Sequence, residues 1–277
     1  MPLPTSPAES DARPITVPRS PALSRGGARG AVRVLERLGA GGHAEVWRAV
    51  DASGEVVALK TLRAELRTDP AAIAALRREH DVLSRVQHPR IVRTLGLTEH
   101  AGGPALLLEY ARNGDLVPLL GTRPQHWLVA AAQVLEGLTH LHSCGFVHGD
   151  LKPRNVLFAA DDSVRLGDFG SALPIGVPLP RGGSTTPYVA PGVDRVGPEM
   201  DGYAFAVLLF ELVYGYLPPA GDDLPNGRSP RPPLSPPDAA AERLGSAACA
   251  ALTAARHAPW GLLAFANVIE SAVEASR

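Results

Sequence analysis

The sequence predicts an α+β protein in which a small antiparallel β-sheet precedes a mainly helical region. Strand-like runs separated by turn-forming residues fill most of residues 31–110, with one helical segment among them. Helical periodicity dominates after residue 111. With 277 residues, 45% of them hydrophobic, the chain is long enough to bury a substantial core. We therefore expect two lobes, the sheet in the first (31–110) and the helices in the second (111–275).

The first lobe is expected to hold five strands and one helix. Residues 1–30 are rich in Pro, Ser, Ala, Gly and Arg and have no periodicity, so we expect them to be disordered. Runs typical of strands start at Val32 and then cover 46–50, 56–62, 91–97 and 105–110. A helix is expected over 71–86, because apolar residues recur there at helical intervals and Asp69-Pro70 supplies a cap.

The second lobe is expected to contain four helices and one hairpin. Helical patterns cover 127–142, 203–217, 239–256 and 261–275, and the hairpin is expected over 155–166. Residues 218–238 are rich in proline and are expected to form a long loop. The most apolar segment, 204–217, is shorter than the ~18 residues of a membrane span and carries Glu211, so we expect a buried helix and no membrane span.

Composition narrows the expected partners and compartment. Lys plus Arg number 27 and Asp plus Glu 28, so no global basic field favours nucleic acid or an anionic membrane surface. Cys144 and Cys249 are far apart and form no CxxC pattern, which argues against a disulfide framework or a zinc site. A reducing cytoplasm is the simpler expectation. The high usage of Ala, Arg, Gly and Pro is typical of a GC-rich bacterial genome.

A glycine-rich turn and a lysine form the first candidate site. Residues 38–46 read LGAGGHAEV, which places Gly39 and Gly41 at a tight turn between two strands. Backbone N–H groups can approach phosphate oxygens there, although many glycine-rich hairpins lack this role. Lys60 lies among apolar residues of the third strand, and Glu79 lies on the next helix. One interpretation is that Lys60 is a solvated lysine on an edge strand and Glu79 is a surface charge. The other is that Glu79 turns inward and holds Lys60 against phosphates.

The densest group of polar residues is HGDLKPRN at 148–155, which an apolar run follows. Asp150 can accept the proton of an attacking hydroxyl, and Lys152 can neutralise a transferring phosphoryl group. Asn155 offers an amide oxygen to Mg²⁺. The alternative is a polar turn before a strand, but this concentration of polar groups favours phosphoryl transfer.

Asp168-Phe169-Gly170 lies just beyond the expected hairpin. The Asp168 carboxylate is a hard oxygen ligand that suits Mg²⁺, which prefers a carboxylate together with phosphate oxygens. The tripeptide by itself is a common turn. Its interval from Asn155 makes it specific, so the sequence predicts Asn155 and Asp168 as ligands of one metal site.

Together these residues resemble the eukaryotic-like Ser/Thr protein kinase superfamily over roughly residues 32–217. The resemblance implies one domain (31–275) with a bilobal fold, in which an N-lobe of antiparallel sheet plus one helix precedes a mainly helical C-lobe. It also implies ATP and Mg²⁺ as cofactors and the Ser/Thr hydroxyls of proteins as acceptors. Pro153 after Lys152 is similar to Ser/Thr kinases rather than to tyrosine kinases.

The resemblance assigns roles to individual residues. Asp150 looks like the catalytic base, Lys152 like the phosphate-contacting lysine, and Asn155 and Asp168 like the magnesium ligands. Cofactor-binding positions implied by the family are Leu38, Gly39, Gly41, Val46, Ala58, Lys60, Glu79, Glu109, Ala111 and Leu157. Within this set, the segment from Glu109 to Ala111 resembles the hinge that hydrogen-bonds adenine. The family also implies a stacked hydrophobic spine of Leu83, His148 and Phe169, anchored by Asp201.

Two positions depart from the family pattern. Gly149 stands where an arginine commonly receives an activation-loop phosphate, so we expect activity that such phosphorylation does not gate. Gly192 stands where the family usually has a glutamate that pairs with an arginine of the C-terminal helices, so that anchor cannot form. The proline-rich stretch after residue 217 falls where substrate-binding helices normally stand.

Two other functions remain open at this point. His-Gly-Asp at 148–150 with a downstream asparagine also resembles aminoglycoside phosphotransferases, which act on small molecules. Lys152, the Asp-Phe-Gly sequence and residues 185–191 favour protein substrates instead. The third possibility is a pseudokinase that acts as a scaffold, which the retained phosphate- and metal-binding groups oppose.

Overall fold

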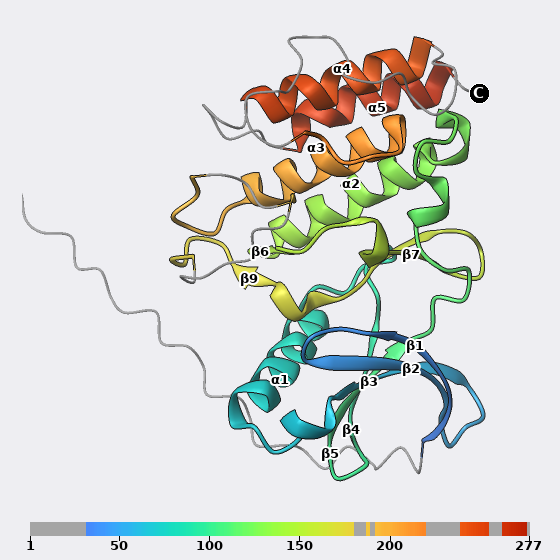
Figure 1. Cartoon of the computed structure of the whole chain (residues 1–277), viewed down its shortest axis with the longest axis vertical. Coiled ribbons are helices and arrows are strands. Elements are labelled where there is room, and N and C mark those ends of the chain that lie inside the picture. Colours follow the sequence, from blue (N-terminus) through green and yellow to red (C-terminus); the bar gives the residue numbers. More distant parts are fainter. Residues whose placement is uncertain (1–31, 180–186, 189–191, 220–238, 255–261, 276–277) are drawn as a thin grey trace, which may run out of the picture.

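The computed structural model describes residues 32–179, 187–188, 192–219, 239–254 and 262–275. Figure 1 shows two lobes, a sheet-rich lobe at the bottom and a helical lobe at the top. This arrangement confirms the predicted α+β, two-lobed fold class. The segment expected to be disordered, 1–30, and nearly all of the proline-rich stretch 218–238 lie outside the described residues.

The N-lobe sheet is antiparallel throughout. Its strands are β1 (Arg33–Ala40), β2 (Ala44–Val50), β3 (Val56–Leu62), β4 (Thr94–His100) and β5 (Gly103–Glu109), in the order β1-β2-β3-β5-β4. β4 begins three residues later than predicted, because Ile91 forms a bridge with Leu166 of the other lobe instead of pairing in this sheet. β3 is a central strand, so the interpretation of Lys60 as an edge-strand residue is wrong.

Helix α1 (Pro70–Arg85) lies beside the N-lobe sheet (Figure 1). It begins at a cap: the Asp69 carboxylate accepts a 2.7 Å hydrogen bond from the Ala72 N–H, and Pro70 occupies the first turn, where no amide donor is needed. Its buried stripe consists of Leu76, Glu79, Val82 and Leu83, at the spacing of one helix face. A carboxylate at one of these apolar positions is turned toward the interior of the lobe.

The C-lobe is mainly helical, with short strands near the lobe junction. Its helices are α2 (Leu128–Ser143), α3 (Pro198–Tyr214), α4 (Ala239–Ala254) and α5 (Leu263–Ala275). Its strands are β6 (Phe146–Val147), β7 (Val156–Phe158), β8 (Val164–Leu166) and β9 (Leu173–Pro174), paired as β7–β8 and β6–β9. The short 3-10 helix η1 (Ala64–Leu66) belongs to the N-lobe, and the C-lobe holds η2 (Val117–Leu119), η3 (Pro124–His126), η4 (Pro153–Asn155) and η5 (Phe169–Ser171). β7 and β8 form the predicted hairpin.

Helix α3 is the centre of the C-lobe core. Almost every residue from Asp201 to Tyr214 is buried, and the Phe205 ring meets Phe265 of α5 edge-on at 5.2 Å between ring centres. The helix stops earlier than predicted because Gly215 adopts a left-handed φ of 78° and donates its N–H to Glu211 O at 2.8 Å. Among the described helices, none has both the length and the apolar character needed to span a membrane.

Candidate active site

Several predicted cofactor-binding residues lie side by side on the N-lobe sheet. Gly39 pairs with Val46 across β1 and β2, and Val46 pairs with Lys60 across β2 and β3. Ala58 shares a face with Lys60, because side chains alternate along a strand. Ala58 and Lys60 are 8% and 9% exposed, whereas Leu38 on β1 is 43% exposed. The register therefore brings these positions together on one part of the sheet.

The glycines at the end of β1 and in the β1–β2 turn have free space on the side where other residues carry a β-carbon. Neither Gly39 nor Gly42 has a positive φ, and a β-carbon added to either would meet no heavy atom within 4 Å. At Gly41 the nearest atom would be Ala44 O at 3.7 Å, an ordinary contact. The fold itself thus does not demand glycine here. An uncovered backbone of this kind suits the close approach of phosphate oxygens to N–H groups.

Lys60 is held between two carboxylates from different parts of the chain. Its Nζ lies 2.7 Å from both carboxylate oxygens of Glu79 and 2.7 Å from Asp168 Oδ1. The side chain of Glu79 is 3% exposed and that of Lys60 11%, whereas Asp168 is 48% exposed. Glu79 is therefore turned inward, and the interpretation as surface charge is wrong.

The three charges shift one another's pKa values. Burial acts to lower the pKa of Lys60, but the charges of Glu79 and Asp168 outweigh it and raise that pKa above its ordinary value. Burial raises the pKa of Glu79, and the Lys60 charge opposes it only in part. Burial also acts to raise the pKa of Asp168, yet the charge and hydrogen bond of Lys60 bring it below its usual range. Lys60 and Asp168 are consequently charged at neutral pH.

The catalytic-loop residues form a compact hydrogen-bonded group. Lys152 Nζ donates to Asp150 Oδ2 at 2.7 Å, and Asn155 Nδ2 donates to Asp150 O at 2.7 Å and to Asp150 Oδ2 at 3.1 Å. Helix η4 turns the chain so that Asn155 lies back over Asp150. Within the described residues, both hydrogen bonds of the Asn155 side chain use its nitrogen, so its amide oxygen points away from Asp150.

A buried carboxylate on α3 fixes this loop. The side chain of Asp201, 1% exposed, accepts hydrogen bonds from the N–H groups of His148 at 2.8 Å and Gly149 at 3.0 Å. It also lies 2.8 Å from His142 Nε2. His148 Nε2 in turn lies 2.9 Å from Gly167 O, next to Asp168. Three partners satisfy the buried charge, and the loop is tied both to α3 and to the Asp-Phe-Gly segment.

The Asp-Phe-Gly segment lies against the catalytic loop. Gly167 N donates to Asn155 O at 2.8 Å, and the Phe169 ring, 1% exposed, lies 4.8 Å from the His148 ring. Asp168 has a left-handed φ of 57°, which aspartate tolerates better than most residues. The structure therefore brings together the two segments that carry the predicted metal ligands. The ring contact between His148 and Phe169 is the one that the spine interpretation expects.

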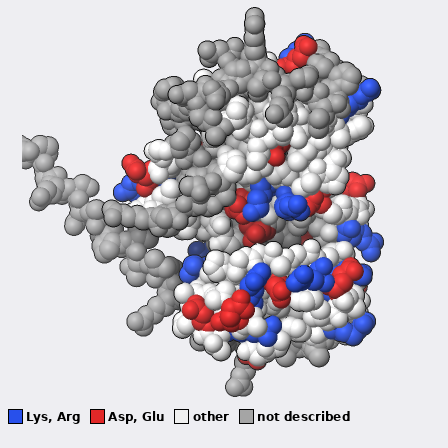
Figure 2. Space-filling view, viewed as in Figure 1, with Lys and Arg blue, Asp and Glu red and all other residues white. Residues whose placement is uncertain are grey.

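Charged groups concentrate where the lobes meet. Figure 2 shows Lys, Arg, Asp and Glu side chains gathered along this junction. Lys152 bonds Asp150 and also lowers the pKa of Asp168, so one ammonium acts on both carboxylates. Over the described ranges, no group of three or more His, Cys, Asp and Glu residues could hold a metal ion. One carboxylate and one amide oxygen, Asp168 and Asn155, fit Mg²⁺, which keeps several waters and binds phosphate oxygens.

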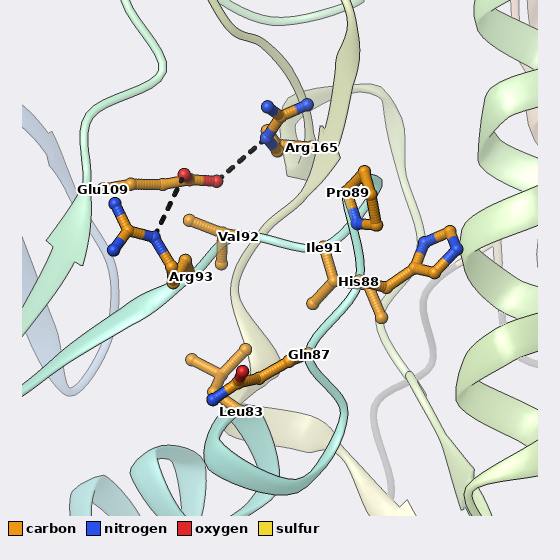
Figure 3. A pocket seen from close by; sticks show the side chains of 9 residues that line it. All are labelled: Leu83, Gln87, His88, Pro89, Ile91, Val92, Arg93, Glu109 and Arg165. Carbon is orange, nitrogen blue, oxygen red and sulfur yellow. Dashed lines mark hydrogen bonds and ion pairs between the residues drawn. The ribbon is translucent and has the colours of Figure 1, made fainter.

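Glu109, the predicted hinge residue at the end of β5, uses its side chain in ion pairs. Its carboxylate lies 2.9 Å from Arg165 Nε of β8 and 3.9 Å from Arg93 Nε (Figure 3). These residues line a cavity of about 370 Å³ together with Leu83, Gln87, His88, Pro89, Ile91 and Val92. None of the predicted phosphate or metal residues lines it. Because the Glu109 N–H donates to Arg93 O at 2.9 Å, a contact between Glu109 and adenine would have to use its carbonyl group.

Two further residues that the sequence predicts to lie near adenine, Leu157 and Ala111, follow the N-lobe sheet in the chain. Leu157 pairs with Arg165 in the β7–β8 hairpin and forms a bridge with Asp115. Ala111, two residues after the end of β5, is partly buried. Asp115 was not predicted as a site residue, although its position as an acidic residue shortly after the predicted hinge could have suggested it. Its carboxylate accepts a 3.0 Å hydrogen bond from the Val117 N–H.

Sequence reasoning also missed a hydrogen bond between Tyr188 and a residue of α3. The Tyr188 hydroxyl donates to the carboxylate of Glu211, which is 7% exposed. Burial, followed by the contact with Glu211, raises the pKa of Tyr188, and burial raises that of Glu211. Glu211 is an acidic residue within an apolar stretch of α3, and this could have suggested a hydrogen-bond partner for it. Thr185, Thr186 and residues 189–191 lie outside the described part of the chain.

The two departures from the family pattern have different backbone settings. Gly149 has a φ of 74°, and a β-carbon there would lie 2.8 Å from the backbone oxygen of Ser171, so no side chain fits without a shift. Gly192 has a φ of 70° but open space around it. Helix α4 packs on α3 through buried residues that include Leu244 and Ala248. The C-lobe core is therefore continued by α4 and α5 beyond the proline-rich stretch.

Comparison with known proteins identifies the family. The family model described as a protein kinase domain matches residues 32–227, more than half of the chain. The chain belongs to the protein kinase domain family. The match covers the N-lobe, the C-lobe as far as residue 227 and every predicted site residue, so the sequence resemblance to eukaryotic-like Ser/Thr kinases is confirmed.

Relatives of this kinase domain include bacterial and eukaryotic proteins. It is 32% identical over 206 residues to the NUAK family SNF1-like kinase 2 of Rattus norvegicus, covering 68% of this chain and 32% of that protein. It is 32% identical over 225 residues to mitogen-activated protein kinase kinase 7 of Arabidopsis thaliana, covering 76% and 71%. It is 33% identical over 205 residues to the serine/threonine-protein kinase PknL of Mycobacterium bovis, covering 68% and 50%. The match spans about a third of the first of these relatives.

Proposed function

We propose that this kinase domain transfers the γ-phosphoryl group of ATP to Ser or Thr hydroxyls of proteins, with Mg²⁺ as the metal. The observation that carries the proposal is the buried Lys60, held at 2.7 Å by Glu79 and by Asp168. An ammonium fixed beside the junction of the lobes supports phosphate binding, because its cost of burial is offset by two carboxylates and its donors are already oriented.

Asp150 and Lys152 are the proposed catalytic residues. The Asp150 carboxylate would orient the acceptor hydroxyl and accept its proton as the new bond to phosphorus forms. Lys152, 2.7 Å from Asp150, would balance negative charge on the phosphoryl group in transfer. The proton moves from the Ser or Thr hydroxyl to the carboxylate, and ADP is the leaving group.

Asn155 and Asp168 are the proposed ligands of Mg²⁺. The ion, when bound, neutralises the charge of the phosphates. The type of oxygen atom supports this proposal: Asp168 offers a carboxylate, and Asn155 offers an amide oxygen, which the hydrogen bonds of the Asn155 nitrogen turn away from Asp150. Lys60 would bind phosphate oxygens, the backbone at Gly39 and Gly41 would cover them, and burial of Glu79 would keep Lys60 in place.

Adenine is proposed to lie near the hinge. Val46, Ala58 and Leu157 would contact its two faces, Leu38 would cover its outer edge, and the backbone of Glu109 and Ala111 would bond its polar edge. These residues combine apolar contacts with few polar groups, as nucleotide sites usually do.

Protein acceptors are favoured over small molecules. Relatives over both lobes carry names of protein kinases, among them serine/threonine kinases of Myxococcus xanthus and Mycobacterium bovis. We further propose that the source is bacterial and the compartment cytoplasmic, in keeping with composition and the two free cysteines. Gly149 supports activity that does not depend on a phosphate bound beside the catalytic aspartate.

Labelled ATP with Mg²⁺ tests the proposal in three parallel reactions. The full chain is incubated with a generic Ser/Thr protein substrate, with kanamycin, and alone, and the label is followed by phosphoamino acid analysis. Phosphoserine or phosphothreonine in protein supports the proposal. Labelled kanamycin without labelled protein would instead indicate a small-molecule phosphotransferase, and ATP binding without transfer to any acceptor would indicate a scaffold.

A further inference from the structure

Arg63, the residue directly after β3, is bonded to the glycine-rich turn. Its Nε donates to Gly41 O at 2.8 Å, and its backbone N–H donates to His43 O at 3.1 Å. The Arg63 side chain is 41% exposed, and its Nη1 lies 4.0 Å from Glu65. Arg63 is not among the residues that the sequence predicts for the phosphate site, because nothing in the sequence links position 63 to position 41.

The first of these bonds fixes the orientation of one peptide group. In a trans peptide the carbonyl and the following N–H point in opposite directions, and the described residues contain no cis peptide. A carbonyl of Gly41 directed at Arg63 therefore directs the N–H of Gly42 away from Arg63. The N–H of Gly41 is already engaged with Ala44 O at 2.8 Å. The Gly42 N–H is thus the donor whose direction Arg63 sets.

The strand geometry indicates where that donor points. Lys60 and Leu62 share one face of β3, and the pairing of β3 with the β2 side continues for one more residue, because the Arg63 N–H donates to His43 O at 3.1 Å. Alternation then puts the Arg63 side chain on the opposite face from Lys60. A donor directed away from Arg63 is directed toward the Lys60 face, where Glu79 and Asp168 also meet. The uncovered backbone at Gly42 leaves room for a phosphate to approach.

We propose that Arg63 is a positioning residue, which holds the Gly41 carbonyl so that the Gly42 N–H donates to the phosphates of ATP. This inference rests on the proposed function. A guanidinium suits the task because it stays charged at all relevant pH values and its Nε–H has a fixed direction. Because the bond from Arg63 holds the turn in place before ATP binds, no binding free energy is spent on ordering the turn.

The test compares binding of ATP and of adenosine to the full chain by calorimetry. Arg63→Ala is expected to weaken ATP binding about tenfold, the value of one hydrogen bond to a charged group. Adenosine binding should not change, because adenosine carries no phosphate. Arg63→Lys is expected to recover part of the loss. Arg67→Ala is the matched control: this nearby arginine bonds Leu62 O and Ala101 O and does not contact the turn.

The outcomes separate this inference from the proposed function. A wild-type chain that binds neither ATP nor adenosine would overturn the proposed function. A wild-type chain that binds both, with Arg63→Ala weakening them equally or not at all, would overturn only the role of Arg63. The amide resonance of Gly42 gives an independent readout: ATP should shift it in the wild type and much less in Arg63→Ala. An equal shift in both proteins would also count against the positioning role.

Discussion

Replacing Lys60 by methionine tests the buried charge cluster at the lobe junction. Methionine keeps most of the apolar stem but removes the ammonium from between Glu79 and Asp168. Removing one partner of a buried ion pair typically costs about 3–5 kcal/mol, because the other charge is left buried and unpaired. The contact with Asp168, whose side chain is 48% exposed, adds only about 0–1 kcal/mol. Since Glu79 can take up a proton, we expect a loss near the lower limit, about 3 kcal/mol.

Urea unfolding of the wild type and four variants measures this loss. Lys60→Met leaves the buried Glu79 charge without a partner, and Glu79→Leu leaves the Lys60 charge with only the half-exposed Asp168, whereas the double variant keeps neither buried charge. The double variant is therefore expected within about 1 kcal/mol of the wild type, although Lys60→Met alone loses about 3. Lys152→Met is the control: its pair with Asp150 is 35% and 24% exposed, so the expected loss is below about 1 kcal/mol. If the double variant lost as much stability as the two single variants together, the cost would not come from an unpaired buried charge.

Three further predictions concern other parts of the chain. Asp150→Asn should lower kcat by about 10²–10⁴-fold with little change in ATP binding, and a kcat within twofold of the wild type would exclude Asp150 as the base. His88 stacks on His140 at 4.5 Å, and burial together with the His140 charge lowers the pKa of His88. The unfolded chain therefore binds more protons below about pH 6.5, and stability should fall as the pH drops from 7 to 5.5. His88→Gln should reduce this fall in unfolding titrations; an unchanged fall would assign it to other groups. Phe265→Ala should cost about 3–5 kcal/mol in urea unfolding, because its ring fills the contact with Phe205, and a loss under 1 would mean that α5 contributes little to the core.

Local periodicity was enough to predict most of the elements. The run 56–62 became β3 without adjustment, and the cap at Asp69 placed the start of α1 within one residue. Both signals depend on neighbouring residues alone. The start of β4 was misplaced because Ile91 bridges to Leu166, a partner in the other lobe that local pattern does not reveal.

The candidate site residues could be proposed from the sequence, but several of their contacts could not be predicted. Asp150, Asn155 and Asp168 lie in short segments whose chemistry is evident from residue type. The inward turn of Glu79 became definite only when the buried stripe of α1 was known. The bond from Arg63 to Gly41 depends on the register of three strands, and the contact from Tyr188 to Glu211 joins a loop to a distant helix. Such pairings are set by tertiary packing, which periodicity does not encode.

Metal-dependent phosphoryl transfer by this kinase domain can be measured by following labelled phosphate from ATP to Ser and Thr side chains in the presence of Mg²⁺. The wild-type chain and Asp168→Asn are each given γ-labelled ATP and a mixture of Ser- and Thr-containing peptides, with and without the metal. We expect labelled serine or threonine only with the wild type and Mg²⁺. Equal labelling by Asp168→Asn, or equal labelling by the wild type after Mg²⁺ is removed with a chelator, would contradict this expectation.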